Sequence, residues 1–377
     1  MKLHVLSEHL QKKLPLINKA VSLKGQLPVL SNVLLEAKGG KLIISSTDLE
    51  IGIQTEIPAN IEQEGGTTVP AKTFSELIAS LPSDKITLEL IENTLKVSTK
   101  KTKSTLQTIP KEEFPAIYEE KGEKVLVMKK GVLQKDFAEV LFAASNDTSR
   151  PALSGILIKK EENGFLLVAT DGYRLSLKKQ ATAMENTSDG GVQEAKFLIP
   201  ARVFKELHGL KEAEDIAIYI AGKSNQIILD QGHTLIVGRM IDADFPAYER
   251  IIPTSSTTKV VFDKEEMQKA IKICAIFARE TANIVRFTVK KDTIIVSANT
   301  PNVGDNTVEV EATLTGDENE VAFNARYLLD FFANIEEETI AFEMSGPLNP
   351  GVFRIKDDNS YLHIIMPIRV QSSGELA

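Results

Sequence analysis

The segment Phe197-Leu198-Ile199-Pro200-Ala201-Arg202-Val203-Phe204-Lys205-Glu206-Leu207 occurs in three versions along the chain. The first version, Val69-Pro70-Ala71-Lys72-Thr73-Phe74-Ser75-Glu76-Leu77, lies 130 residues earlier, counted from Ala71 to Ala201. The third, Phe323-Asn324-Ala325-Arg326-Tyr327-Leu328-Leu329-Asp330-Phe331, lies 124 residues later, counted from Ala201 to Ala325. In each version an apolar run ends at Pro or Asn, and apolar residues then recur at helical spacing. The pattern predicts a strand followed by a short amphipathic helix, used three times.

The repeat extends well beyond these segments. Leu27-Pro28-Val29-Leu30-Ser31 matches Arg150-Pro151-Ala152-Leu153-Ser154 at a spacing of 123 residues, and Thr47-Asp48 matches Thr170-Asp171 at the same spacing. A constant spacing indicates a collinear duplication. The third copy is more diverged, with Ser297-Ala298-Asn299-Thr300 where the Thr-Asp turn would stand. We therefore expect three domains, at residues 1–122, 123–253 and 254–377.

Each copy also begins with a longer helical pattern. Apolar residues at helical spacing predict helices over residues 7–24, 131–144 and 264–279. Short β-branched runs separated by turn signals follow each of them, and helices are too few for parallel βαβ units. Strands are expected in the first copy at Val33–Leu35, Lys41–Ser45, Gly52–Glu56, Thr87–Leu90, Thr94–Ser98 and Leu106–Ile109. The sequence predicts an α+β fold with antiparallel sheets.

Composition bounds the classes of function. The hydrophobic content of 42% is that of a globular protein, and no apolar run reaches the length of a membrane helix or a signal-peptide core. We therefore expect a cytoplasmic protein without a membrane partner. The single cysteine, Cys274, lies on the apolar face of a predicted helix, which excludes disulfides within the chain and predicts core packing.

The net charge of −8 is unevenly distributed. Residues 1–122 hold 15 Lys and Arg against 15 Asp and Glu, whereas residues 254–377 hold 12 against 19. A neutral first domain and an acidic last domain favour head-to-tail association between chains.

Motifs of catalysis and cofactor binding are missing from the sequence. It contains no phosphate-binding loop, dinucleotide fingerprint, zinc-protease motif or nucleophile elbow, so neither a cofactor nor a metal is expected. Asp171 could serve as a carboxylate base in a hydrolase, but Asp-Gly is typical of turns and Asp48 repeats it. A protein without catalytic activity is the better interpretation.

Basic residues follow the shared alanine in all three copies, as Lys72, Arg202 and Arg326. If the short helices share one surface, these charges suit a regular polyanion that is recognised through its phosphates. With no Trp and only 6% aromatic residues, stacking platforms for single strands are lacking, so duplex is favoured.

Four motifs in this order resemble the bacterial DNA polymerase III beta subunit family, the β sliding clamps that serve as processivity factors, over the whole chain. They are Ala169-Thr170-Asp171-Gly172-Tyr173-Arg174-Leu175, Phe245-Pro246-Ala247-Tyr248-Glu249-Arg250, Phe323-Asn324-Ala325-Arg326-Tyr327-Leu328-Leu329-Asp330 and Met366-Pro367-Ile368-Arg369. The resemblance implies a head-to-tail homodimer that closes into a ring of six domains around duplex DNA, with helices inside and antiparallel sheet outside.

The resemblance also implies sites and partners. The replicative polymerase catalytic subunit, the ATP-dependent clamp loader and other replication or repair proteins would insert an extended peptide into a groove formed by Leu153, Thr170, Gly172, Tyr173, Arg174, Leu175, Pro246, Arg250, Ile251, Asn324, Tyr327, Leu348, Pro350, Ile364, Met366, Pro367, Ile368 and Arg369. Duplex DNA, without sequence preference, would contact Lys12, Lys24, Lys72, Arg150, Arg202 and Arg326. The dimer would use Leu106, Ile276 and Phe277.

The sequence also departs from the family. Pro151-Ala152 stands where some members carry an aromatic pair, which affects one DNA contact beside Arg150, and a tail, residues 370–377, continues past the usual end. A monomeric three-domain scaffold that binds peptide or DNA without closing a ring stays open as an alternative, and solution mass distinguishes the two.

Overall fold

The computed structural model describes residues 1–22, 27–128, 130–147, 149–161, 164–181, 196–208, 215–301 and 303–369. The chain forms two compact units. The first contains the described parts of Met1–Leu133 and Arg202–Met240, and the second those of Gln134–Thr182, Val192–Ala201 and Ile241–Ala377. The α-helices of the described residues are α1 (Ser7–Ile17), α2 (Ala71–Ser80), α3 (Lys130–Leu141), α4 (Ala201–His208), α5 (Lys264–Ala278) and α6 (Ala325–Asn334). None of them is long and apolar enough to cross a membrane.

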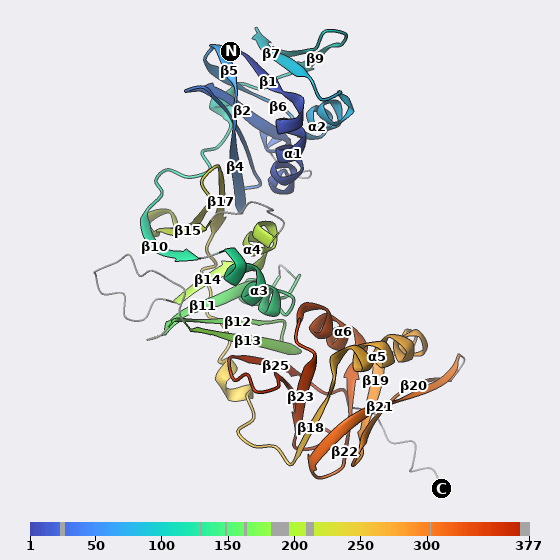
Figure 1. The fold of residues 1–377 in the computed structure, drawn as a ribbon. Helices are drawn as coiled ribbons and strands as arrows, with labels where there is room; N and C mark the ends of the chain where they lie inside the picture. The colour runs from blue at the N-terminus through green and yellow to red at the C-terminus, as the bar shows by residue number, and fades with distance from the viewer. Residues whose placement is uncertain are drawn as a thin grey trace. The chain divides into compact units, whose positions relative to one another are not determined.

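Antiparallel pairing builds both sheets of the first unit (Figure 1). The smaller sheet has the order β5 (Asn60–Gln63), β1 (Lys2–Leu6), β7 (Lys85–Ile91), β8 (Thr94–Ser98) and β9 (Lys103–Gln107). The larger has the order β10 (Glu123–Met128), β15 (Ile216–Ala221), β16 (Gln226–Asp230), β17 (Thr234–Arg239), β4 (Ile51–Pro58), β3 (Lys41–Thr47), β2 (Asn32–Lys38) and β6 (Gly65–Pro70).

The second unit has one antiparallel sheet of 12 strands. Its order is β14 (Lys196–Pro200), β11 (Gly155–Glu161), β12 (Gly164–Thr170), β13 (Arg174–Ala181), β25 (Tyr361–Ile365), β24 (Gly351–Ile355), β23 (Thr339–Met344), β18 (Thr258–Asp263), β21 (Gly304–Gly316), β20 (Thr293–Thr300), β19 (Ile284–Val289) and β22 (Asn319–Asn324). Helices α5 and α6 pack on its apolar side chains, and Cys274 is fully buried there, as predicted. With the antiparallel sheets, the expected α+β class is confirmed.

One strand pairing occurs once in each unit. In the first unit, Ile51–Thr55 of β4 pairs with Thr234–Gly238 of β17. In the second, Arg174–Lys178 of β13 pairs with Tyr361–Ile365 of β25. One more hydrogen bond extends each pairing. Arg239, the residue after Gly238, donates its N–H to the carbonyl of Glu50, which precedes β4, and Met366, the residue after Ile365, donates to the carbonyl of Tyr173, which precedes β13. We call these pairings the first and the second junction.

Two details of the sequence prediction were wrong. The helix expected over residues 7–24 ends at Ile17, because Ser46 Oγ donates a hydrogen bond to the Ile17 carbonyl at 2.5 Å and only a short 3₁₀ turn, Asn18–Ala20, follows. The last strand of the first copy is Lys103–Gln107, not Leu106–Ile109, because Thr68 exchanges backbone hydrogen bonds with Ile109 and directs the chain away from β8. The surface loop expected at 184–192 and the tail at 370–377 lie outside the described residues.

Candidate functional site

A tight turn between β12 and β13 positions the motif residues of the second unit. Asp171 Oδ1 accepts the N–H groups of Tyr173 and Arg174 at 2.9 and 3.0 Å, and Thr170 Oγ1 donates to the Arg174 carbonyl at 2.6 Å. Asp48 makes the same pair of bonds in the first copy, to the N–H groups of Glu50 and Ile51. The prediction that Asp171 is a turn residue is therefore confirmed.

Gly172 makes this turn possible. Its φ of 92° is a left-handed conformation that glycine adopts without strain. A Cβ at Gly172 would lie 4.0 Å from Leu153 Cδ1 and 3.9 Å from Arg150 Nη1, so both side chains lie beside the glycine. The turn thus places Gly172, the residue before Tyr173, beside Leu153.

The side chain of Arg174 is buried and bonded to two carboxylates. Its side chain is only 9% exposed, its Nε donates to Asp171 Oδ2 at 3.1 Å, and its Nη1 donates to Asp330 Oδ2 at 2.7 Å. The guanidinium also lies 4.7 Å from the ring centre of Tyr327 and 5.5 Å from that of Phe142, in the range of cation–π contacts. Arg174 is therefore a fixed part of the site, because its Nε and Nη1 already donate to carboxylates of the protein.

The rings of Tyr173 and Tyr327 form an aromatic wall. Their centres are 6.4 Å apart and their planes differ by 19°, while Tyr173 is 57% exposed. Partial burial and the nearby Asp171 carboxylate raise the pKa of Tyr327. The wall presents aromatic surface to solvent.

The floor behind this wall is apolar. Leu175 and Ile364 are buried in one cluster with Tyr248, which follows Pro246 and accompanies the exposed Ile251 in a short 3₁₀ helix. Burial and the adjacent Glu249 raise the pKa of Tyr248. An apolar floor beside aromatic rings is suited to burying an aliphatic or aromatic side chain.

Three neighbouring strands end together at this site. Arg174 pairs with Ile365, and Ile365 pairs with Gly351. Tyr173 and Pro350, which precede β13 and β24, therefore lie at the same end of the sheet as Met366, which follows β25. Met366 is 36% exposed and donates its N–H to the Tyr173 carbonyl at 2.8 Å. The structure thus brings Met366 next to Tyr173 of the aromatic wall.

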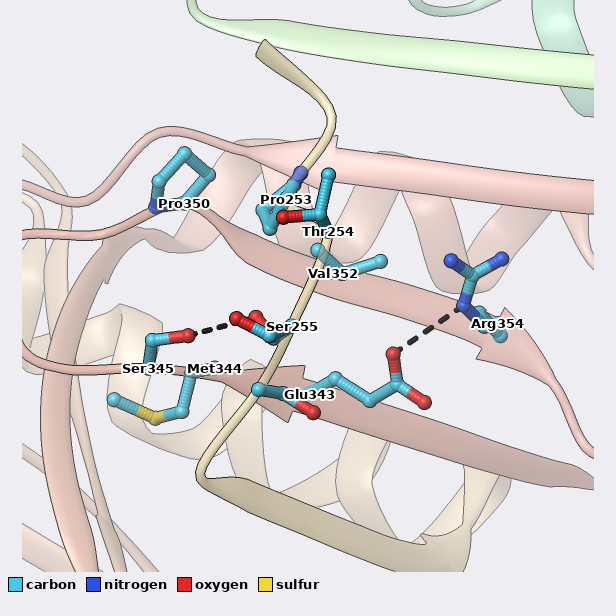
Figure 2. A pocket seen from close by; sticks show the side chains of 10 residues that line it. Pro253, Thr254, Ser255, Glu343, Met344, Ser345, Pro350, Val352 and Arg354 are labelled. Carbon is cyan, nitrogen blue, oxygen red and sulfur yellow. Dashed lines mark hydrogen bonds and ion pairs between the residues drawn. The ribbon is translucent and has the colours of Figure 1, made fainter.

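Pro350 also lines the pocket of about 140 Å³ shown in Figure 2. The chain around Ser255 passes over β23 and β24 there, and Ser345 Oγ donates to the Ser255 carbonyl at 2.9 Å. On the same face Arg354 Nε donates to Glu343 at 3.4 Å. Polar groups in this pocket bond one another, so its chemistry differs from that of the apolar floor.

The remaining predicted groove residues lie at or near the surface of the second unit. Asn324 caps α6 by accepting the Arg326 N–H at 2.9 Å, and Ile368 donates its N–H to the Ala322 carbonyl at 2.8 Å, which places both near the start of α6. Leu348 is 60% exposed in a turn. Half-buried or exposed side chains also belong to Pro246, Arg250, Pro367 and Arg369.

Two residues that position the wall were missed from the sequence. Asp330 lies three residues after Tyr327 on α6, a spacing that places both on one side of the helix, so this neighbour could have been found. Phe142 follows α3 and contacts Arg174 only through the tertiary fold, and no local pattern marks it.

The predicted DNA contacts differ in how free their charges are. Lys12, Lys72 and Arg326 are exposed, and Arg150 is exposed beside Asp147. Arg202 instead forms an ion pair with Asp48 and donates to the Lys19 carbonyl at 2.6 Å, so part of its charge is neutralised. Lys24 lies outside the described residues. DNA binding by these residues stays a prediction.

The predicted dimer contacts lie on an end strand and on a helix. Leu106 belongs to β9, the end strand of its sheet, and is half-buried. Ile276 is 56% exposed on α5, and a Cβ at Gly304, at the start of β21, would lie 4.0 Å from Phe277 Cε1. Within the described part of the chain, no group of three or more His, Cys, Asp or Glu side chains is arranged to hold a metal ion.

Family comparisons cover nearly the whole chain. Models of the DNA polymerase III beta subunit match it in three parts, the N-terminal domain at residues 1–118, the central domain at 127–247 and the C-terminal domain at 249–369. A protein of Synechococcus elongatus named "Beta sliding clamp" is 27% identical over 99% of this chain and 100% of its own length. A "Beta sliding clamp" of Staphylococcus aureus is 27% identical over 93% of this chain and 94% of its own.

Solved structures agree. The DNA polymerase III beta subunit of Thermotoga maritima superposes with a TM-score of 0.87 at 28% identity, over 98% of this chain and all of the other. The beta subunit of Pseudomonas aeruginosa gives a TM-score of 0.89 at 27% identity with the same coverage.

Proposed function

Because this chain belongs to the DNA polymerase III beta subunit family, we propose that it is a sliding clamp. Two copies would close head to tail into a ring around duplex DNA and tether the replicative polymerase catalytic subunit for processive synthesis. The ATP-dependent clamp loader and other replication or repair proteins would use the same groove. The clamp would act in the cytoplasm, without catalysis of its own, through three domains at residues 1–122, 123–253 and 254–377.

Two of the strand edges that stay open among the described residues support ring closure. The two junctions inside the chain each join the fourth strand of one repeat to the last strand of the next. The third repeat ends this series with β21, whose residues 304–311 pair with β20 on one side only, and the first repeat begins it with β9, an end strand. An open edge of this kind invites another strand. A second copy supplies the missing strand at both edges.

The internal junctions also give the register of this contact. Equivalent pairs align the repeats. In the third repeat Val296 pairs with Val308 as Leu167 pairs with Lys178 in the second. In the first repeat Leu95 pairs with Leu106 as Gly351 pairs with Ile365 in the third. Gly304 therefore takes the place of Arg174, and Leu106 that of Ile365. The pairs between protomers would be Leu106 with Gly304, Thr105 with Asp305, Ser104 with Asn306, Lys103 with Thr307, and Thr102 with Val308.

Side-chain direction agrees with this register. Ser104 and Leu106 are half-buried while Lys103 and Thr105 are exposed, and Asn306 is half-buried while Asp305 is exposed. A slip by one residue would turn every side chain to the other face. In this register Leu106 would meet Gly304, beside Phe277, so two of the three predicted dimer residues would lie together.

Exposed charges on the two edges are opposite in sign. Lys101 and Lys103 lie on or next to β9, and Asp305 and Glu309 lie on β21. In the proposed register Lys103 lies diagonally between the two carboxylates, and Lys101 faces Glu309. Opposite charges at such positions stabilise strand pairs, whereas a pair of two β9 or two β21 edges would repel.

Topology then explains how an acidic protein can stay on DNA. A closed ring retains duplex mechanically, so its inner surface needs only weak phosphate contacts from exposed side chains such as Lys12, Lys72 and Arg326. The acidic remainder of the surface repels DNA. The alternative, a monomeric scaffold that binds peptide or DNA, lacks an account of the two open edges.

Solution mass and cross-linking test the proposal. Light scattering should give about twice the chain mass of 41.4 kDa. Cysteines at Thr105 and Asp305, both exposed and paired in this register, should form a disulfide between protomers in the doubly substituted chain, because the native Cys274 is buried. Cysteines at Ser104 and Asp305, one residue out of register, serve as the control. A particle of 41.4 kDa, or equal cross-linking of both pairs, contradicts the proposed ring or its register.

A further inference from the structure

We infer that Asp330 is a positioning residue of the peptide groove, acting through Arg174 on Tyr327. The inference rests on the groove of the proposed function and goes beyond it, because Asp330 itself need not touch a peptide. Asp330 would hold the aromatic wall in the shape that binds an extended peptide with an aliphatic or aromatic anchor.

The two carboxylates around Arg174 have different tasks. Asp171 uses Oδ1 for the turn, where it accepts two N–H groups, and only Oδ2 for Arg174 Nε. Among the side chains that the structure describes, the Asp330 carboxylate bonds Arg174 alone, accepting from Nη1 at 2.7 Å. A carboxylate that bonds only the guanidinium can fix its orientation without building the turn.

The orientation of the Arg174 guanidinium determines how the ring of Tyr327 is supported in the aromatic wall. Arg174 lies between Phe142 and Tyr327, at 5.5 and 4.7 Å from the ring centres, and Tyr327 in turn faces Tyr173 at 6.4 Å. Tyr327 and Asp330 lie three residues apart on α6, so one helix supplies both the ring and the carboxylate that aligns the cation on it. With Asp330 neutral, Arg174 would keep one carboxylate partner and Tyr327 would lose its fixed support.

The first junction contains a related link. Glu206, which occupies the Asp330 position on α4, forms an ion pair of 2.7 Å with Lys19, at the position of Phe142. In both junctions, therefore, a carboxylate of the short helix forms an ion pair with a basic side chain of the preceding repeat. Only in the second junction does that cation support an exposed pair of aromatic rings among the described residues, and there the link gains a binding role.

Peptide affinity should therefore depend on Asp330 more than stability does. A wall that is already ordered spares the peptide the entropy of ordering it. We expect Asp330→Asn to weaken binding about threefold to tenfold, the range for losing one partly exposed charge-assisted bond. Asp330→Glu should restore much of the affinity, because it returns the charge.

The experiment measures binding of a fluorescein-labelled peptide, copied from the clamp-binding segment of the replicative polymerase, to the full-length protein. Glu337→Gln is the matched control, because it breaks another 2.7 Å ion pair, with Lys135, just past the same helix. The chain has no Trp, so Tyr173→Trp adds a single reporter whose emission should change with Asp330→Asn and stay unchanged with Glu337→Gln.

A double-variant cycle with Tyr327→Leu decides how Asp330 acts. If Asp330 works through the ring, Asp330→Asn should have no further effect on peptide affinity in the Tyr327→Leu protein. Equal losses in both backgrounds, or an unchanged affinity of Asp330→Asn, would overturn the inference. A wild-type protein that fails to bind the peptide at all would instead refute the proposed groove.

Discussion

Lys178 Nζ lies 2.7 Å from Glu139 Oε2, and both side chains are buried, at 9% and 2% exposure. This ion pair lies in the second unit, on the same face of β13 as Arg174 and Ser176. The equivalent positions in the first unit hold Thr55 and Leu16, which are buried without charge. Equivalent positions of the two repeats thus hold an ion pair in one unit and two uncharged side chains in the other.

Breaking this pair on one side should be costly. Lys178→Met leaves Glu139 buried without its partner, which we expect to lower the free energy of unfolding by about 3 to 5 kcal/mol. The double variant Lys178→Met with Glu139→Leu should lose clearly less, because only the two more distant carboxylates, Asp358 at 3.8 Å and Asp136 at 4.0 Å, then lack the cation. Chemical denaturation of both variants measures the difference. Equal losses would show that the pair contributes no coupling.

His363 predicts how stability depends on pH. Complete burial, followed by the charge of Arg174, holds its pKa well below 6.5, and its Nδ1 lies 2.7 Å from Ser176 Oγ. Below pH 6.5 the unfolded chain therefore binds a proton that the folded chain does not. This contribution is complete above pH 6.5 and is lost as the pH falls toward the folded pKa, by at most about 1.4 kcal/mol per pH unit.

Substitution at that residue tests the pH dependence. His363→Phe should remove this part of the slope of unfolding free energy between pH 6.5 and 5, whereas His233→Gln, at a histidine whose side chain is 64% exposed, should leave it. Unfolding in urea at several pH values measures both. An unchanged slope in His363→Phe would contradict the assignment.

Charged residues in the groove should separate binding from folding. Leu153→Asp together with Met366→Asp places carboxylates beside the aromatic wall, where both native side chains are partly exposed. Peptide affinity should fall by about 30-fold or more, and stimulation of the polymerase should be lost. The melting temperature should change little. Polymerase stimulation that survives both substitutions would refute the groove assignment.

Charge exchange should control ring closure. Lys101→Glu with Lys103→Glu should weaken the homodimer about tenfold or more, and so should Asp305→Lys with Glu309→Lys, because each produces like charges at both contacts. An equimolar mixture of the two variants should form heterodimers, since each contact then joins opposite charges. Light scattering and native mass spectrometry distinguish these species. Variants that remain homodimers would show that these charges do not specify the contact.

DNA contacts should reflect the pairing of each basic side chain. Arg326→Gln removes an exposed charge and should reduce the salt dependence of DNA binding by about one counterion. Arg202→Gln should change it less, because Asp48 already pairs with Arg202. Titration of duplex at several salt concentrations compares them. A larger effect of Arg202→Gln would reverse this order.

The sequence alone determined the threefold repeat, the α+β class, the short helix after each shared alanine, the Asp48 and Asp171 turns and the burial of Cys274. These features depend on local physics, namely side-chain periodicity, turn hydrogen bonds and apolar spacing. The predicted groove residues between Thr170 and Leu175 also lie together, because one turn carries all of them.

Only the tertiary structure decided which residues meet across the repeats. Arg174 finds Asp330 at a separation of 156 residues, and the junctions set which strand edges are paired and which stay open. The end of α1 at Ile17 likewise depends on Ser46, a partner from another strand. Such contacts depend on how whole elements pack, and the local pattern around each residue carries no information about its distant partner.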